Sequence, residues 1–175
     1  DIGTLDNSGT ILGQGDTSFV HGVSLGGSGN STTTLNNSGT ISGVAGTNSA
    51  KGLKITSTEI GTVNNSNTIN ATSTTSHSYG VYLNIAYYGS DTTITNLTNT
   101  GTISASSGTN TSYGVYLYSA YGSDATITNF TNTGTISSSV GSGFDVFDIN
   151  IGDATITNLN NSQGKDGNDV LTYNG

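Results

Sequence analysis

The feature that most constrains this chain is an internal repeat. The twelve letters TITNLTNTGTIS, from Thr93 to Ser104, recur from Thr126 to Ser137 with one change, Leu97 to Phe130. An apolar residue followed two positions later by Asn anchors each unit, at Leu5, Leu35, Val63, Leu97, Phe130 and Leu159. A single repeat unit cannot bury its apolar face alone, so the repeat predicts a solenoid in which successive coils stack.

Each unit contains short stretches with apolar residues at every second position, which is typical of strands. One such block recurs as Gly22–Leu25, Gly52–Ile55, Gly80–Leu83 and Gly114–Leu117, and Asp145–Ile149 is aligned as its fifth copy. Gly and β-branched residues disfavour helix throughout. Three strands per unit predict an all-β fold, a right-handed three-faced parallel β-helix of five to six coils. It is expected to span residues 1–163, and residues 164–175 a turn-rich tail or the start of a next element.

Equivalent positions in stacked coils should form columns. An inward column is predicted for the Thr-Ile pairs, and stacked amides should bond to their copies in the coils on either side. The isoleucines are Ile11, Ile41, Ile69, Ile103 and Ile136; the asparagines are Asn7, Asn37, Asn65, Asn99, Asn132 and Asn161, with a shorter column of Asn96, Asn129 and Asn158.

The charge balance excludes several partners. Arg is absent, and three Lys against eleven Asp and Glu give a net charge of -8. Nucleic acids and anionic membranes attract clustered basic residues, so neither is expected as a partner. No apolar run is long enough for a transmembrane helix. The chain has no Cys, which excludes disulfides and Cys-ligated zinc.

The repeat letters resemble a known family. LNNSGTISG, from Leu35 to Gly43, and TITNLTNTGTIS are similar to the passenger repeats of bacterial autotransporters, the type V secreted surface proteins. The similarity runs from Leu5 to Asn161 and carries no catalytic residue. It implies an extracellular or bacterial cell-surface location, with adhesion, self-association or biofilm formation as the role.

Aromatic residues supply the candidate binding surface. With Val and Leu pointing inward, Tyr82, Tyr116 and Phe147 are predicted to point outward on successive coils, and Ser24 and Lys54 continue that column. Tyr88, Tyr118 and Tyr121 are expected to widen the surface from the following loops, whereas Tyr79, Tyr113 and Phe144 share the inward parity. Such a stripe can bind a sugar or a protein. The alternative is an aromatic ladder that only stabilises the sheet.

Acidic residues raise the question of a metal. Asp91, Asp124 and Asp153 align, and either cap turn amides or share a calcium ion. GKDGNDVLT, from Gly164 to Thr172, resembles one copy of a calcium-binding nonapeptide, a motif that needs neighbouring copies. We therefore predict turn capping, no metal site and no cofactor, with calcium as the alternative.

The predicted function is adhesion or self-association, without enzymatic activity. The expected partner is a second copy of the chain, or a protein or glycan of a host or neighbouring cell. Three alternatives remain open: a filament subunit that stacks end to end, a polysaccharide-active enzyme using Asp145, Asp148 and Asp153, and an ice-binding protein. The last rests on the Thr residues that flank Ile94, Ile127 and Ile156.

Overall fold

The computed structural model of the chain describes residues 3–26, 30–56, 59–84, 91–119, 123–139, 144–148, 154–161 and 171–174. Every regular element in these ranges is a β-strand, and all strand pairs are parallel. Among the described residues no helix is long and apolar enough to cross a membrane.

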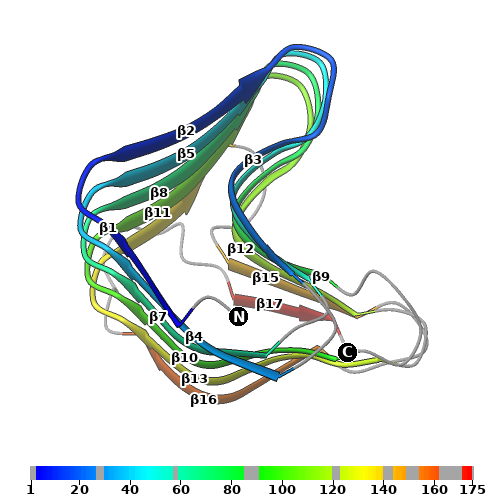
Figure 1. Ribbon diagram of the computed structural model, residues 1–175. Helices are drawn as coiled ribbons and strands as arrows, with labels where there is room; N and C mark the ends of the chain where they lie inside the picture. The colour runs from blue at the N-terminus through cyan, green and yellow to red at the C-terminus, as the bar shows by residue number, and fades with distance from the viewer. Residues whose placement is uncertain are drawn as a thin grey trace.

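The strands form three parallel sheets that enclose the core, with the coils stacked one behind another (Figure 1). Sheet A contains β1 (Thr4–Asn7), β4 (Asn30–Asn37), β7 (Glu59–Asn65), β10 (Thr92–Asn99), β13 (Ala125–Asn132) and β16 (Ala154–Asn161). Sheet B contains β2 (Thr10–Gly15), β5 (Thr40–Ala45), β8 (Thr68–Ser73), β11 (Thr102–Ser107) and β14 (Thr135–Ser138). Sheet C contains β3 (Val20–Gly26), β6 (Ala50–Thr56), β9 (Ser78–Asn84), β12 (Ser112–Ser119), β15 (Phe144–Asp148) and β17 (Leu171–Asn174).

The chain is thus an all-β parallel β-solenoid with three faces, as the repeat predicts. It makes about four turns rather than the five to six predicted. The coils become irregular toward the C-terminal end, where β14 is shortened to 4 residues. Among the described residues, sheet B ends at β14, whereas sheet A continues to β16 and sheet C to β17.

Strand register follows the sequence repeat closely. Leu97 pairs with Phe130, and Ile103 pairs with Ile69 on one side and Ile136 on the other. The whole predicted isoleucine column is in register from β2 to β14. Its members from Ile41 to Ile136 are buried, and Ile11 is partly buried against the core. Matched apolar residues therefore stack on one another along the solenoid axis.

The core has a wide part and a narrow part. The wide part contains most of the buried Leu, Ile and Val side chains of all three sheets. Sheets B and C converge at one corner of the cross-section (Figure 1), where a second cluster consists of Val20, Ala45, Ala50 and Ala71. The small side chains fit this corner because the two sheets approach closely there.

Asparagine ladders run along the solenoid, the longer one at the corner between sheets A and B and the shorter one within the strands of sheet A. Asn37 Nδ2 donates to Asn65 Oδ1 over 2.7 Å, and Asn65 Nδ2 donates to Asn99 Oδ1 over 2.7 Å. The same bond continues to both ends of the predicted column, at Asn7 and at Asn161. The shorter predicted ladder is also confirmed, because Asn129 donates to Asn96 and Asn158 donates to Asn129.

One alignment made from the sequence is wrong. The fifth copy of the sheet C block was placed two residues away from its observed register. Phe144 pairs with Val115, and Phe147 pairs with Tyr118, not with Tyr116. The residue opposite Tyr116 is Asp145. Phe147 therefore does not continue the column formed by Tyr82 and Tyr116.

Candidate functional site

A bend in the strands of sheet C creates the most distinctive outer surface of the described chain. In β9, Gly80, Val81 and Leu83 are buried, whereas Tyr79 and Tyr82 are half-buried. Tyr79 was predicted to point inward because it lies an odd number of residues from Tyr82. The strand instead bends at Gly80, whose backbone lies against Ile103 of sheet B, and the rings of Tyr79 and Tyr82 meet at 4.7 Å.

Two columns of side chains consequently share this outer face, which we name the tyrosine–lysine face. One column comprises His21, Lys51, Tyr79 and Tyr113, and the other Ser24, Lys54, Tyr82 and Tyr116. Tyr118 adds a further ring, 6.4 Å from that of Tyr116. The columns come from β3, β6, β9 and β12, so four consecutive coils contribute to the face.

The tyrosine rings are stacked along the solenoid axis. The ring centroids of Tyr82 and Tyr116 are 5.6 Å apart and the planes are 6° from parallel. Those of Tyr79 and Tyr113 are also 5.6 Å apart, with an angle of 13°. Such pairs stabilise neighbouring strands, as the aromatic-ladder interpretation requires. Each ring in a stack covers much of its neighbour's flat surface, so the ring edges and hydroxyl groups offer the contacts.

Lys51 ends the stack on its N-terminal side. Its Nζ lies 5.2 Å from the ring centroid of Tyr79, 5.0 Å from that of Tyr82 and 5.4 Å from that of Phe19. The residue is only 6% exposed, whereas Phe19 is 66% exposed. The ammonium group is therefore held among three aromatic rings, which attract it through their negative faces.

Burial and mutual repulsion lower the proton affinity of the basic groups. Desolvation, followed by the nearby charge of Lys54, lowers the pKa of Lys51 to about 8. Desolvation and the charges of Lys51 and Lys54 lower the pKa of His21 to about 4. Burial, helped by Tyr113, raises the pKa of Tyr79 to about 12. Burial also raises the pKa of Tyr82, with smaller contributions from Tyr79 and Tyr118.

These shifts predict a rise in stability with pH. The unfolded chain holds more protons than the folded chain between about pH 4 and 6.5 because of His21, and between about pH 8 and 10.5 because of Lys51. We expect the free energy of unfolding to increase by about 2 kcal/mol from pH 7.5 to 9.5, measured by urea denaturation. Above pH 10 the raised pKa of Tyr79 reverses the trend, since the folded chain then keeps a proton that the unfolded chain loses.

The matched variant is Lys51→Met, which keeps an unbranched side chain among the rings and removes the charge. Its stability should change little between pH 7.5 and 9.5. An equal rise in the variant and in the unmodified chain would mean that another group causes it.

The structure brings together only some of the residues predicted for binding. Tyr82, Tyr116 and Tyr118 lie together on the tyrosine–lysine face. Phe147 is in register with Tyr118 on β15, and Tyr88 and Tyr121 lie outside the described residues. Sequence reasoning missed Lys51 and His21 as members of the face. The sequence spacing indicates that Lys51 belongs to the column of Tyr79, because Lys51 precedes Tyr79 by the same number of residues as Lys54 precedes Tyr82.

The predicted acidic column is a capping element where the structure describes it. The backbone N–H of Asp124 donates to Asp91 Oδ1 over 2.9 Å, so this carboxylate caps an amide of the next coil. Asp153 and most of the nonapeptide-like stretch from Gly164 to Thr172 lie outside the described residues. Within the described part of the chain, no group of three or more His, Cys, Asp or Glu residues is placed to hold a metal ion.

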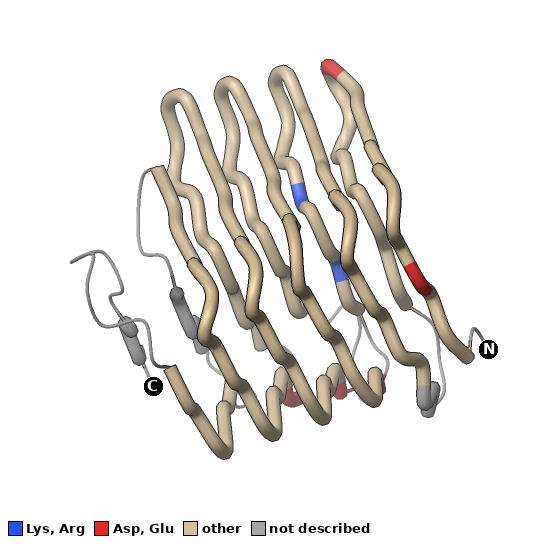
Figure 2. The backbone as a smooth tube through the Cα atoms, turned by 90° about the vertical axis from the view of Figure 1, so that its left-hand side faces the viewer, with Lys and Arg blue, Asp and Glu red and all other residues tan. Residues whose placement is uncertain are grey.

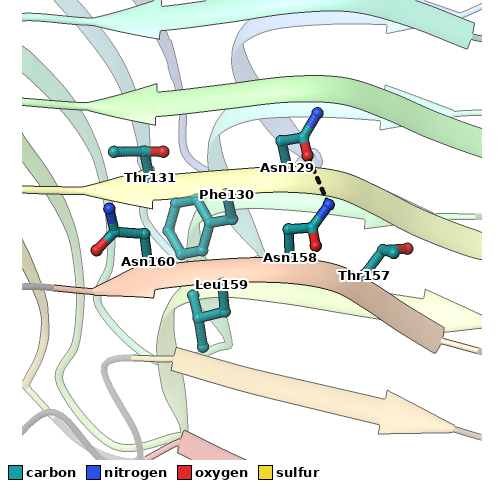
Figure 3. Close-up of a pocket in the computed structure, with 7 residues that line it drawn as sticks. All are labelled: Asn129, Phe130, Thr131, Thr157, Asn158, Leu159 and Asn160. Atoms are coloured by element: carbon teal, nitrogen blue, oxygen red, sulfur yellow. Dashed lines mark hydrogen bonds between the residues drawn. The ribbon is translucent and has the colours of Figure 1, made fainter.

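A shallow hollow lies elsewhere, over the strands β13 and β16 (Figure 3). Its volume is about 330 Å³, and its lining consists of Asn129, Phe130, Thr131, Thr157, Asn158, Leu159 and Asn160. Leu159 is 42% exposed there. The lining contains only amides, hydroxyls and apolar groups, and none of the residues predicted for binding. A further coil stacked on β16 would cover it, so we do not assign the hollow a ligand.

Comparison with known proteins does not add a family to this description. No family model, curated protein or solved structure matches the chain.

Proposed function

We propose that the chain is an adhesive binding module of the bacterial cell surface, and that the tyrosine–lysine face is its contact surface. One observation carries the proposal. Tyr79, Tyr82, Tyr113 and Tyr116 are gathered with both described lysines on the outside of sheet C. Tyrosine supplies contact area and hydrogen bonds at low entropic cost, which is why it is enriched at binding surfaces.

The scaffold suits such a role. The asparagine ladders and the stacked core hold the face in one arrangement before any partner arrives. Binding to a preorganised surface loses less conformational entropy. The aromatic stacking that stabilises the sheet and the contact role are therefore compatible, because the tyrosines are only half-buried.

The finer aspects of the architecture belong to the same proposal. We propose that the coil is right-handed, since connections between parallel strands of one sheet nearly always have that hand. The resemblance of the repeat letters to autotransporter passengers supports an extracellular location and a passenger role. On this proposal the chain binds a partner and does not catalyse a reaction.

Adhesion of coated beads tests the function. Beads that carry the chain should be retained on a layer of bacterial or epithelial cells well above beads coated with albumin. Tyr82→Ser combined with Tyr116→Ser should reduce retention to the albumin level. Tyr82→Phe with Tyr116→Phe should retain the ring stack and lose part of the binding, because only the hydroxyl groups are removed.

The control variant is Thr98→Ala with Thr131→Ala, two half-buried positions paired on sheet A. It should bind as the unmodified chain does, and circular dichroism should show equal strand content in all variants. If the serine variant is retained as well as the unmodified chain, the contact surface lies elsewhere. If no coated bead is retained on any layer, the adhesive function is wrong.

A further inference from the structure

The cationic groups of the tyrosine–lysine face have no counter-charge in the described structure. Both described lysines lie on one strand, β6, in a chain whose net charge is -8, and Figure 2 shows the two blue positions on a single coil. Burial, followed by the charges of Lys51 and Lys54, lowers the pKa of His21. Among the described residues no carboxylate pairs with Lys51 or Lys54. The ammonium groups of Lys51 and Lys54 therefore repel each other on a partly desolvated surface. Their charges also help to keep His21 unprotonated at neutral pH.

Such an arrangement is stabilised when an anion binds. A negative group beside Lys54 would offset the repulsion that lowers the pKa of Lys51 and of His21. The remainder of the acidic chain repels anions, so this face is where they would concentrate. Lys54 is the contacting cation because it is half-buried, whereas Lys51 lies beneath the rings.

A row of hydrogen-bond donors continues from Lys54. The column Ser24, Lys54, Tyr82, Tyr116 places a hydroxyl or ammonium group on each of four consecutive coils. Coils of a parallel solenoid repeat about every 4.8 Å, the spacing of hydrogen-bonded strands. The face thus presents donors at regular intervals along the solenoid axis, with the positive charge toward its N-terminal end.

We infer that the tyrosine–lysine face binds a linear carboxylated glycan, laid along the solenoid axis with a carboxylate on Lys54 and hydroxyls on Tyr82 and Tyr116. The inference rests on the proposed function and names its ligand class. One pyranose ring with its glycosidic oxygen spans nearly the distance between neighbouring coils along the axis, so successive sugars can contact successive donors.

The same spacing disfavours an acidic peptide. An extended peptide advances about 3.3 Å per residue, and side chains on one face recur at about twice that distance, which does not match the coil repeat. A second copy of the chain is acidic as a whole, but its exposed carboxylates Asp6, Asp16 and Glu59 do not lie in one column at the coil repeat, since Asp6 pairs with Asn36 and Glu59 with Asn30. A flexible polymer with one charge per ring fits the donor row better.

Calorimetric titration with defined oligomers tests the inference. The probes are a hexamer of 1,4-linked galacturonate, the same hexamer with every carboxylate methyl-esterified, and hexaglutamate. The acidic sugar should bind at least about tenfold more tightly than its ester, as expected for charge-assisted hydrogen bonds. Lys54→Gln should remove that preference, whereas Lys165→Gln, which changes the net charge equally, should keep it.

A pH series gives an independent signature. The groups around Lys51 are His21 from β3, Lys54 from its own strand, and Tyr79 and Tyr82 from β9. Affinity for the acidic hexamer should fall from pH 7 to pH 9 as Lys51 loses its proton, and Lys51→Gln should show a smaller fall. The esterified hexamer should show no such dependence.

Three outcomes overturn the inference. They are equal binding of acid and ester, tighter binding of hexaglutamate than of the sugar, and sedimentation that shows self-association abolished by Lys54→Gln. If one of these outcomes is found and bead adhesion still depends on Tyr82 and Tyr116, the adhesive function is retained and the ligand is a different one. If the acidic sugar binds but the coated beads do not adhere, the glycan site is supported and the adhesive function is rejected.

Discussion

Replacing Asn65 with alanine is expected to lower the free energy of unfolding by about 3 kcal/mol. Asn65 is 1% exposed and lies in the middle of the buried ladder. It accepts from Asn37 Nδ2 and donates to Asn99 Oδ1, and its Nδ2 also bonds the carbonyl of Thr102 over 3.1 Å. Alanine leaves a donor on one side and acceptors on the other without partners, at a depth where water does not replace them.

Asn64→Ala is the matched control, because the neighbouring residue belongs to a ladder on the outer surface. Asn64 Nδ2 donates to Asn36 Oδ1 over 2.9 Å, and its side chain is half-buried. Water can satisfy the groups that this change exposes, so we expect a loss below about 1 kcal/mol. Urea denaturation of both variants measures the difference. Equal losses would show that burial does not set the strength of the inner ladder.

The two ladders run in opposite directions. In the buried ladder each Nδ2 donates toward the C-terminal end, from Asn7 to Asn37 and onward. In the outer ladder donation runs toward the N-terminal end, from Asn64 to Asn36 and from Asn36 to Asp6. An ionised carboxylate can only accept, so Asp6 fixes the direction of its ladder. The single acidic residue in that column thereby orients the amides that follow it.

Much of the fold could be predicted because stacking makes each coil a template for the next. The pairing of Leu97 with Phe130 and of Asn99 with Asn132 follows directly from the repeated letters. Register errors appear where the letters diverge. The fifth block of sheet C was aligned two residues away from its observed position, and Phe147 was assigned to the wrong column. A shift of two residues keeps the alternation of inward and outward side chains, so periodicity cannot detect it.

The candidate site was predicted only in part for a different reason. Period-two reasoning assumes a straight strand, and on that assumption Tyr79 and Tyr82 point to opposite sides. The bend at Gly80 places both on the tyrosine–lysine face. With Tyr79 and Tyr113 assigned to the interior, the equivalent Lys51 was not recognised as a neighbour of the rings. The bend depends on contact between two sheets, which local sequence does not reveal.

That contact makes Gly52→Ala the second large expected effect. A Cβ atom at Gly52 would lie 2.7 Å from the Gly80 carbonyl oxygen, 2.8 Å from that of Asn70 and 2.8 Å from Ile69 Cγ2. Two of these atoms are backbone oxygens, one on β9 of the same sheet and one on β8 of sheet B, so β6 must shift away from both strands. We expect the free energy of unfolding to fall by about 3 kcal/mol, at the upper end of the usual cost of overpacking.

Gly9→Ala provides the comparison, because no atom lies within 4 Å of the Cβ that it would add. Its stability should stay close to that of the unmodified chain, which separates the effect of close approach from that of replacing a glycine. The rings report the same event, since displacement of β6 from the Gly80 carbonyl of β9 moves Lys51 away from Tyr79. Gly52→Ala should therefore return the pKa of Lys51 toward its ordinary value and flatten the rise of stability between pH 7.5 and 9.5. A variant that loses stability with this rise intact would mean that the bend at the glycines does not build the tyrosine–lysine face.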